Sequence, residues 1–274
     1  MDHVPDLYDQ GLQADIATLI DRRRVLQLIG LAGVFTVAAC APGASSSASA
    51  LASAAATSGS SADCDPIPEE TAGPYPGDGS NGPDVLEESG VVRSDIRSSF
   101  GASSGTAEGV PLTIRLLIQD ESRACEPLAG AAVYLWHCDR EGRYSMYSDG
   151  IEDQNYLRGV QATDADGLVT FTSIFPATYS GRWPHIHFEV YPDVATTADA
   201  GKKIATSQVA LPAGICAEVY ATAGYEQSVA NFAQVSLESD NVFRDDGGVR
   251  QLGTISGSVA DGLVVELAVP VTPA

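Results

Sequence analysis

Short runs of alternating apolar and polar residues dominate the sequence after residue 64. Alternate side chains of a strand point to the same face, so such runs predict strands with one face toward a core. The clearest runs are rich in β-branched and aromatic residues, which favour an extended backbone. They cover residues 112–118 (LTIRLLI), 132–136 (AVYLW), 168–174 (LVTFTSI), 185–191 (HIHFEVY) and 204–211 (IATSQVAL).

Turn sequences rich in glycine and aspartate separate these strands, as in DADG at residues 164–167 and DDGG at 245–248. Later strands are predicted around residues 233–237 and 262–269, and one helix at 217–228. Many short strands with frequent turn signals are typical of an all-β fold. We therefore predict an antiparallel β-sandwich with little helix.

The first 63 residues follow a different pattern. Three arginines at 22–24 precede an apolar run at 25–39, and small residues lead up to Cys40. The run is shorter than the roughly 20 residues that a membrane-spanning helix needs, so it predicts an export signal. The order resembles a twin-arginine signal followed by a bacterial lipoprotein processing box, which would leave the protein exported and lipid-anchored at Cys40. The alternatives are an ordinary cleaved signal peptide or a chance run of arginines.

Residues 40–63 are mostly serine, alanine and glycine. Such a segment buries too little apolar surface to offset the entropy cost of ordering it, so we expect a flexible linker. The predicted organisation is an export signal at residues 1–39, a linker at 40–63 and one β-sandwich domain at 64–274.

The formal net charge is −21 at pH 7, and no basic patch with interleaved aromatic residues occurs. Nucleic acid is therefore not expected as a partner. Glycine-rich phosphate-binding motifs and the G-x-S-x-G motif are also absent, which leaves nucleotide-binding and serine-hydrolase functions without support. Membrane contact is expected only through the lipid anchor. A homo-oligomer is one of the assemblies that the sequence leaves open.

Four cysteines remain if Cys40 is lipidated, and an even number in an exported protein favours two disulfides. The sequence does not choose among their three pairings. Free buried thiols are one alternative, and a thiolate metal site is another, although no C-x-x-C spacing supports it. The four residues are Cys64, Cys125, Cys138 and Cys216.

Two of the four histidines, His185 and His187, lie two positions apart in a predicted strand. Their imidazoles should face the same side, where both could bind one metal ion. Two histidines on a solvated strand face are the alternative. A carboxylate could complete an iron site, but no motif singles out Glu189 or Asp193.

Two tyrosines are better candidates for the remaining ligands. Tyr144 follows the strand at 132–136, and Tyr179 precedes the strand that holds the histidines. A phenol has a pKa of about 10, so it binds as phenolate only to a strong Lewis acid, and ferric iron meets this demand better than zinc or calcium. The alternative is a half-buried ring whose hydroxyl bonds to the backbone.

Two stretches, PLAGAAVYLWHCDREGRYS and TDADGLVTFTSIFPATYSGRWPHIHF, carry a family resemblance. They resemble the intradiol ring-cleavage dioxygenases, the group of protocatechuate 3,4-dioxygenase and catechol 1,2-dioxygenase. TAGPYP at residues 71–76 is similar to that family's TEGPY motif, and the resemblance spans residues 64–211. It implies a non-haem Fe(III) ion held by four ligands, Tyr144, Tyr179, His185 and His187.

The resemblance also implies a reaction. A small aromatic diol and O2 would be the substrates, and cleavage between the two hydroxyls would give a cis,cis-muconate-type product that contains both oxygen atoms. Tyr179 would be the ligand that the substrate displaces and that accepts a proton, while Arg182 would stabilise developing negative charge. Tyr75 and Gln208 correspond more loosely to family residues near the substrate.

Some features depart from the family pattern. Only residues 180–184 separate Tyr179 from His185, and Ala72 stands where the family has glutamate. The helical dimerisation segment of the catechol-specific branch has no counterpart. These differences concern specificity and assembly. His137 is a fifth candidate ligand, although we expect it in the core or beside the site. A non-catalytic transthyretin-like binding module is the alternative from another functional class.

Overall fold

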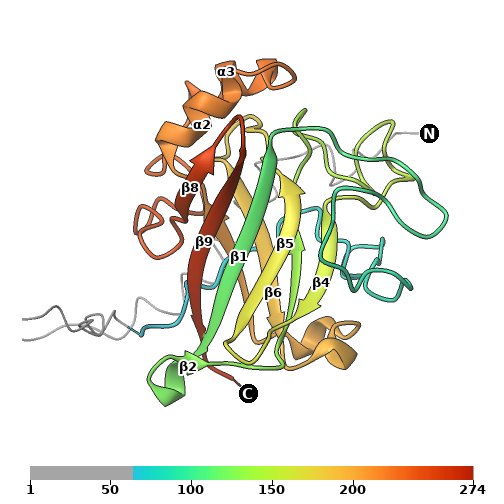
Figure 1. Cartoon of the computed structure of the whole chain (residues 1–274), viewed down its shortest axis with the longest axis vertical. Helices are drawn as coiled ribbons and strands as arrows, with labels where there is room; N and C mark the ends of the chain where they lie inside the picture. The colour runs from blue at the N-terminus through green and yellow to red at the C-terminus, as the bar shows by residue number, and fades with distance from the viewer. Residues whose placement is uncertain (1–63, 274) are drawn as a thin grey trace, which may run out of the picture.

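The computed structural model describes residues 64–273. The predicted export signal, the linker and Cys40 therefore lie outside the described residues. The predicted β-sandwich is confirmed, because two sheets pack face to face and the two short helices lie at one end (Figure 1). Within the described part of the chain, no helix is both long and apolar enough to cross a bilayer.

One sheet has five strands in the order β2-β1-β9-β8, and β5 also pairs with β1. The pairing of β1 with β9 is parallel, unlike the predicted antiparallel pattern, and the other pairs are antiparallel. The strands are β1 (Pro111–Asp120), β2 (Glu126–Pro127), β5 (Leu168–Ile174), β8 (Thr254–Ser258) and β9 (Gly262–Val271).

The second sheet has four antiparallel strands in the order β4-β3-β6-β7. They are β3 (Ala132–Trp136), β4 (Arg158–Ala162), β6 (His185–Tyr191) and β7 (Ala205–Ala210). The remaining elements are the 3₁₀ turns η2 (Glu121–Arg123), η3 (Val194–Thr196) and η4 (Ala200–Lys202) and the helices α2 (Ala213–Tyr220) and α3 (Glu226–Phe232).

A hydrophobic core fills the space between the sheets. From β6 it receives Ile186, Phe188 and Val190, every second residue, as the strand period requires. The five-stranded sheet contributes alternate residues of β1, such as Ile114 and Leu116. The remaining residues of β6 must therefore point to the opposite face of the four-stranded sheet.

Loops cover that opposite face. Val91, from the segment before β1, packs there with Tyr134 and Trp136 of β3. Backbone bonds attach the same segment to the sheet, as in the 2.8 Å bond from the Val160 N–H to the Val91 carbonyl. Every residue of β3, β6 and β7 is consequently buried. We call this side of the four-stranded sheet, which carries His185 and His187, the loop-covered face.

Three predicted strands, at 132–136, 168–174 and 185–191, are confirmed with their bounds. The single helix predicted at 217–228 is wrong, because α2 and α3 are separate and Gly224 between them has a φ of +94°, which no helix continues. The strand predicted at 233–237 is also wrong. Its apolar residues Val235 and Leu237 pack in a small cluster with Trp183 and Phe243 instead of pairing in a sheet.

One disulfide, Cys64–Cys125, is present, with a Cα–Cα distance of 5.7 Å. Cys138 and Cys216 are buried free thiols, so the expected second disulfide is wrong. The reason is their position in separate clusters. Cys138 packs beneath the loop-covered face, with its thiol 3.6 Å from the Ala177 carbonyl, whereas Cys216 on α2 packs in the core between the sheets.

Candidate active site

Four polar side chains meet on the loop-covered face. His185 and His187 come from β6, Tyr144 from the loop between β3 and β4, and Tyr179 from the segment before β6. The structure thus brings together the four residues predicted as metal ligands. The separations are 3.1 Å for His185 Nε2 to His187 Nε2, 3.2 Å for Tyr179 Oη to His185 Nε2, 3.4 Å for Tyr144 Oη to Tyr179 Oη and 3.5 Å for Tyr144 Oη to His185 Nε2.

The surrounding chain orients both imidazoles. His185 Nδ1 lies 2.5 Å from the Trp183 carbonyl, so Nδ1 carries the proton that it donates and Nε2 presents a lone pair to the cluster. The His187 ring stacks on Trp136 of the neighbouring strand, with centroids 4.8 Å apart and planes 7° from parallel. Gly73 approaches the His187 ring so closely that a Cβ would lie 3.4 Å from it, and its φ of +72° favours glycine.

The TAGPYP segment also reaches the cluster. The Tyr75 ring lies 4.9 Å from the Tyr144 ring, centroid to centroid, which places Tyr75 beside the site as predicted. Tyr144 is 2 % exposed, and its N–H donates to Ser148 Oγ at 2.9 Å. Tyr179 is more open, because its side chain is only partly buried.

Burial sets the protonation of these groups. Burial first, and then the nearby Arg182 cation, lowers the pKa of His185 well below its ordinary value, and burial followed by the neighbouring His185 does the same for His187. Both imidazoles are therefore neutral, which is their ligating form. Burial and the facing Tyr179 raise the pKa of Tyr144 well above its ordinary value. This phenol ionises only when a strong cation lies beside it.

The donor set fits a hard trivalent metal ion. Donor atoms about 3 Å apart are those expected around one ion with bonds of about 2 Å. His187 Nδ1 is buried without a hydrogen-bond partner, so the ring is held by stacking with its Nε2 in the cluster. Among residues 64–273 no group of three His, Cys, Asp or Glu side chains could hold a metal. A metal site on this face would therefore need the two phenol oxygens beside the two imidazoles.

Arg182 and Gln208 lie beside the four donors. Arg182 Nη1 is 3.4 Å from His185 Nε2, and Arg182 Nη2 donates to Gln208 Oε1 at 2.6 Å. Gln208 pairs across the sheet with His187. Burial alone would lower the pKa of Arg182, but the electrostatic interactions with Tyr179 and Asp240 raise it above its usual value. Both sequence-predicted residues therefore belong to this cluster.

Comparison with known proteins decides the family. The family model described as "Dioxygenase" matches residues 81–246. The chain belongs to the intradiol ring-cleavage dioxygenase family. The match continues well past residue 211, where the sequence resemblance was expected to end, and starts after the TAGPYP motif.

Solved and curated relatives are similar to this dioxygenase family member. A structure of an intradiol ring-cleavage dioxygenase from Tetranychus urticae is 27% identical, with a TM-score of 0.61, and the match covers 77% of this chain and 96% of that one. A chlorocatechol 1,2-dioxygenase from Pseudomonas sp. (strain P51) is 30% identical over 130 residues, 41% of this chain and 49% of the relative. One from Rhodococcus opacus is 40% identical over 53 residues, 19% of this chain and 21% of the relative. The chain thus spans half or less of the length of these curated relatives.

Other predicted candidates lie apart from the donor cluster. His137 uses both ring nitrogens, Nε2 with Ser173 Oγ at 2.7 Å and Nδ1 with the Cys138 carbonyl at 2.8 Å, which agrees with a role in the core. Glu189 faces Lys203 at 2.8 Å. Asp193 caps η3. Neither carboxylate joins the two histidines.

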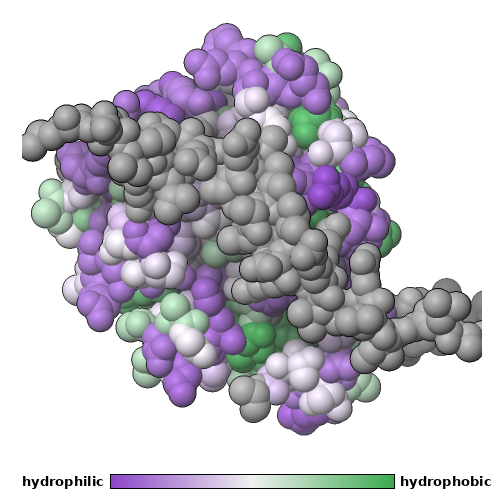
Figure 2. All heavy atoms as spheres, turned by 180° about the vertical axis from the view of Figure 1, so that it is seen from behind, coloured by the Kyte–Doolittle hydropathy of each residue, from purple (hydrophilic) through white to green (hydrophobic). Residues whose placement is uncertain are grey.

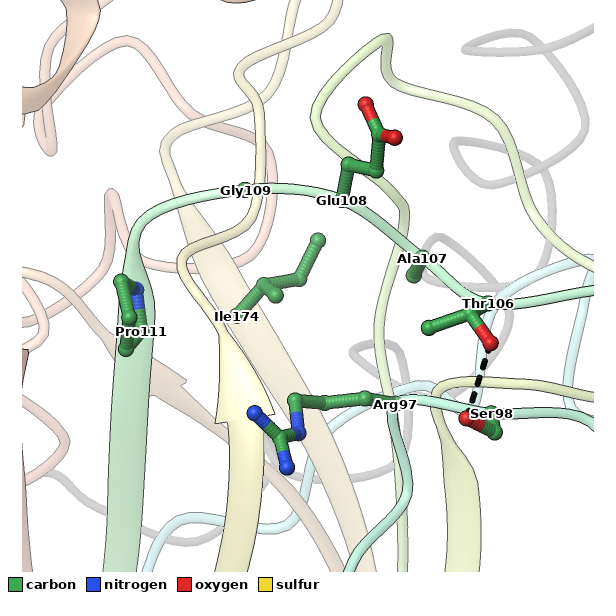
Figure 3. A pocket seen from close by; sticks show the side chains of 8 residues that line it. All are labelled: Arg97, Ser98, Thr106, Ala107, Glu108, Gly109, Pro111 and Ile174. Atoms are coloured by element: carbon green, nitrogen blue, oxygen red, sulfur yellow. Dashed lines mark hydrogen bonds between the residues drawn. The ribbon is translucent and has the colours of Figure 1, made fainter.

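A surface hollow of about 420 Å³ near the start of β1 is also distinct from the donor cluster. Figure 3 shows Arg97 on one side and the Ser98–Thr106 hydroxyl pair on another. Arg97 is bound to Asp95 at 2.6 Å, and none of the four donor residues lines the hollow. Seen from behind, many of the visible described residues are hydrophilic, with smaller groups of hydrophobic residues among them (Figure 2).

Sequence reasoning missed one residue of the cluster, Asp240. Its Oδ2 accepts from Arg182 Nε at 3.0 Å. The residue lies in a turn-rich segment after α3, 58 positions from Arg182, and an isolated acid there carries no local signal. The family match extends to residue 246, and this extent is the one signal that includes position 240 in the family domain.

Proposed function

We propose that this protein is a non-haem Fe(III) intradiol dioxygenase that cleaves a catechol-type ring between its two hydroxyl groups. The observation that carries the proposal is the convergence of two phenol oxygens and two imidazole nitrogens, with neighbouring donors 3.1–3.5 Å apart, on one buried face. Family membership and the names of the catechol and chlorocatechol 1,2-dioxygenase relatives support a catechol-type substrate.

The proposed reaction consumes one O2 and needs no external reductant. The bond between the two hydroxyl-bearing ring carbons breaks, and each of these carbons becomes a carboxyl carbon of a cis,cis-muconate-type diacid. The ring is oxidised and O2 is reduced, so both atoms of O2 end in the product.

The two tyrosines among the four donors would have different roles in the reaction. Ferric iron bound by Tyr144, Tyr179, His185 and His187 would supply Lewis acidity that favours the deprotonated diol and its electron donation toward O2. Tyr144 is buried and packed against Tyr75, so it stays in place. Tyr179 is the more open phenol, and its Oη can move away and hold a proton taken from the diol.

Arg182 supplies a fixed positive charge. Its Nη1 faces the cluster at 3.4 Å from His185 Nε2, where it would stabilise negative charge that develops on the ring during attack by O2. The side chain is 4% exposed, so water screens this charge little. The Tyr75 ring packs beside that of Tyr144, where it would contact a diol bound at the donors.

A visible spectrum tests the ligand assignment. Iron-loaded protein should show a phenolate-to-iron charge-transfer band and a burgundy colour. Tyr179→Phe should weaken the band and slow turnover. Tyr147→Phe is the matched control, because the Tyr147 ring also lies near Tyr75, at 5.3 Å, but its hydroxyl bonds to Asn81 instead of facing the donors. Full colour and rate in Tyr179→Phe would move the assignment to another tyrosine.

Ring-cleavage assays test the reaction itself. Catechol, protocatechuate and hydroxyquinol should be offered with O2, and the products identified by mass. A cleaved diacid with both oxygen atoms from ¹⁸O2 is expected for at least one substrate. Iron-loaded protein that stays colourless and cleaves none of them would favour the transthyretin-like binding module.

We also propose export and a lipid anchor at Cys40, on the basis of the arginines at 22–24 and the small residues before the cysteine. Expression in a bacterial host that processes lipoproteins should place the protein in the membrane fraction. Cys40→Ser should release it, whereas an unchanged distribution would contradict the anchor.

A further inference from the structure

Asp240, the ion-pair partner of Arg182, accepts two hydrogen bonds on each carboxylate oxygen. The carboxylate is fully buried. Its Oδ2 accepts from Arg182 Nε at 3.0 Å and from the Trp183 N–H at 2.6 Å. Its Oδ1 accepts from the N–H groups of Val242 at 2.8 Å and Phe243 at 3.2 Å. Both oxygens therefore act as acceptors, and the same carboxylate ties the segment after α3 to the start of β6.

Arg182 is held from two sides. Asp240 takes Nε, and Gln208 Oε1 takes Nη2 at 2.6 Å. Gln208 is itself fixed, because its Nε2 donates to the Thr71 carbonyl at 3.0 Å. The remaining nitrogen, Nη1, faces His185 Nε2 at 3.4 Å. The guanidinium plane is thus fixed with one edge toward the donor cluster.

We propose that Asp240 is a positioning residue that aims Arg182 at the substrate. The inference rests on the proposed function, since Arg182 must act on a bound diol. An unsupported arginine has several rotatable bonds, and a cation stabilises a transition state best when it is already oriented. Asp240 supplies this orientation from a segment distant in sequence, and it contacts no metal donor itself.

The variant Asp240→Asn tests the proposal, because it keeps the shape and removes the negative charge. Turnover should fall by about 10–100-fold, as is common when a supporting partner of an active-site residue is lost. Iron content and the phenolate band should not change, because all four donors remain. Arg182→Leu should lower turnover at least as much.

A double-mutant cycle separates positioning from a merely structural role. If Asp240 acts through Arg182, adding Asp240→Asn to Arg182→Leu should change turnover by less than about twofold. A structure of Asp240→Asn without iron provides a readout independent of activity, and the Arg182 guanidinium should be rotated or disordered in it. Asp240→Glu, which keeps the charge but lengthens the side chain, serves if Asp240→Asn does not fold, and it should also lower turnover with an intact band.

Asp78→Asn is the matched control. Asp78 is likewise a buried carboxylate that pairs with a cation, Lys203 at 3.3 Å, and accepts from a backbone N–H, that of Ser80 at 3.0 Å. The Asp78→Asn variant should be less stable than wild type but should keep the wild-type turnover per folded molecule.

Three results would overturn the proposal. The first is unchanged turnover in Asp240→Asn, and the second is an equal fold-decrease in turnover when Asp240→Asn is made in wild type and in Arg182→Leu. The third is an Arg182 side chain that keeps its original orientation in the Asp240→Asn structure. Failure of the proposed function would look different. Wild-type protein would then cleave no diol, while the orientation of Arg182 in the Asp240→Asn structure would still be measurable.

Discussion

The two sheets of the sandwich bury their residues in different ways. Positions along β1 of the five-stranded sheet alternate between buried and partly exposed, whereas all seven positions of β6 in the four-stranded sheet are buried. The five-stranded sheet uses one face for the core and leaves the other to solvent. The four-stranded sheet has a second covered face, and that face carries polar side chains whose burial must be compensated. The loops, by covering a second face, thus create the buried environment in which the four candidate donors meet.

The strand β6 contributes one face to the core and the other face to the candidate site. Ile186 and Phe188 of β6 belong to the core between the sheets, while His185 and His187 lie on the loop-covered face. Glu189 continues this polar face, and Lys203 compensates its charge at 2.8 Å. Stability and chemistry should therefore be separable by substitutions one residue apart.

The largest effect is expected from His185→Ala. Removal of a donor should abolish tight iron binding and lower turnover by at least about 10³-fold. The control is Thr170→Ala on the solvated face of β5, which should keep both. Iron content per chain and turnover are the measurements. An iron-loaded, coloured His185→Ala protein would show that the donor cluster is not the metal site.

Phe188→Ala should instead weaken the fold. Phe188 is fully buried between the sheets, and loss of a core phenylalanine costs about 3–5 kcal/mol. Denaturant unfolding measures this cost. The molecules that remain folded should keep the phenolate band, because no donor has changed. If the folded variant lost iron, the two faces of β6 would not be independent.

Much of the fold follows from local pattern. The strands at 132–136, 168–174 and 185–191 were predicted with their bounds because alternation and β-branched residues mark them. β4 (RGVQA) and β8 (TISGS) were missed, since neither sequence has the apolar alternation of a strand. They pair because β3 and β9 present open edges to them, which is tertiary information.

The site divides in the same way. The two-residue spacing of His185 and His187 places them on one face by strand geometry alone. Tyr144 and Tyr179 were candidates from their positions beside two predicted strands, and the family resemblance then implied that both are ligands. Asp240 could not be predicted, because its contact with Arg182 spans 58 residues and its neighbours indicated a strand that does not form. The Cys64–Cys125 pairing could not be predicted either, because four cysteines allow three pairings.

The disulfide should contribute less than the core. Cys64 begins the described chain, Cys125 immediately precedes β2, and the two are 61 residues apart in sequence. The bond thus fastens the covering loops to the five-stranded sheet. Replacing both residues by serine should cost about 2–4 kcal/mol of unfolding free energy, mainly by freeing the unfolded chain. Denaturant unfolding measures the loss, and turnover at a temperature where the protein is folded should stay within about twofold. Loss of iron at that temperature would show that the loops need this clamp to form the site.

The smallest effect concerns the pH dependence of stability and involves Glu70, which lies in the covering segment just before TAGPYP. Its backbone N–H bonds to the Thr206 carbonyl of β7 at 2.7 Å, and Gln251 Nε2 lies 3.4 Å from its carboxyl. Burial first, and then the charge of Asp245, raises the pKa of Glu70 to about 8. The folded protein therefore binds this proton more tightly than the unfolded chain.

Protonated Glu70 therefore stabilises the fold. This stabilisation is complete below about pH 4.5 and is lost as the pH rises toward about 8. Glu70→Gln should therefore flatten the fall of unfolding free energy with pH, by about 1 kcal/mol between pH 6 and pH 7. Thr170→Ala, on the solvated face of β5, changes no titratable group, so it is the control and should leave the slope as it is. Unfolding curves across this window measure both slopes. Equal slopes for Glu70→Gln and wild type would mean that covering the second face does not perturb this carboxyl. The cost of burying polar groups there would then fall on the four candidate donors and their partners instead.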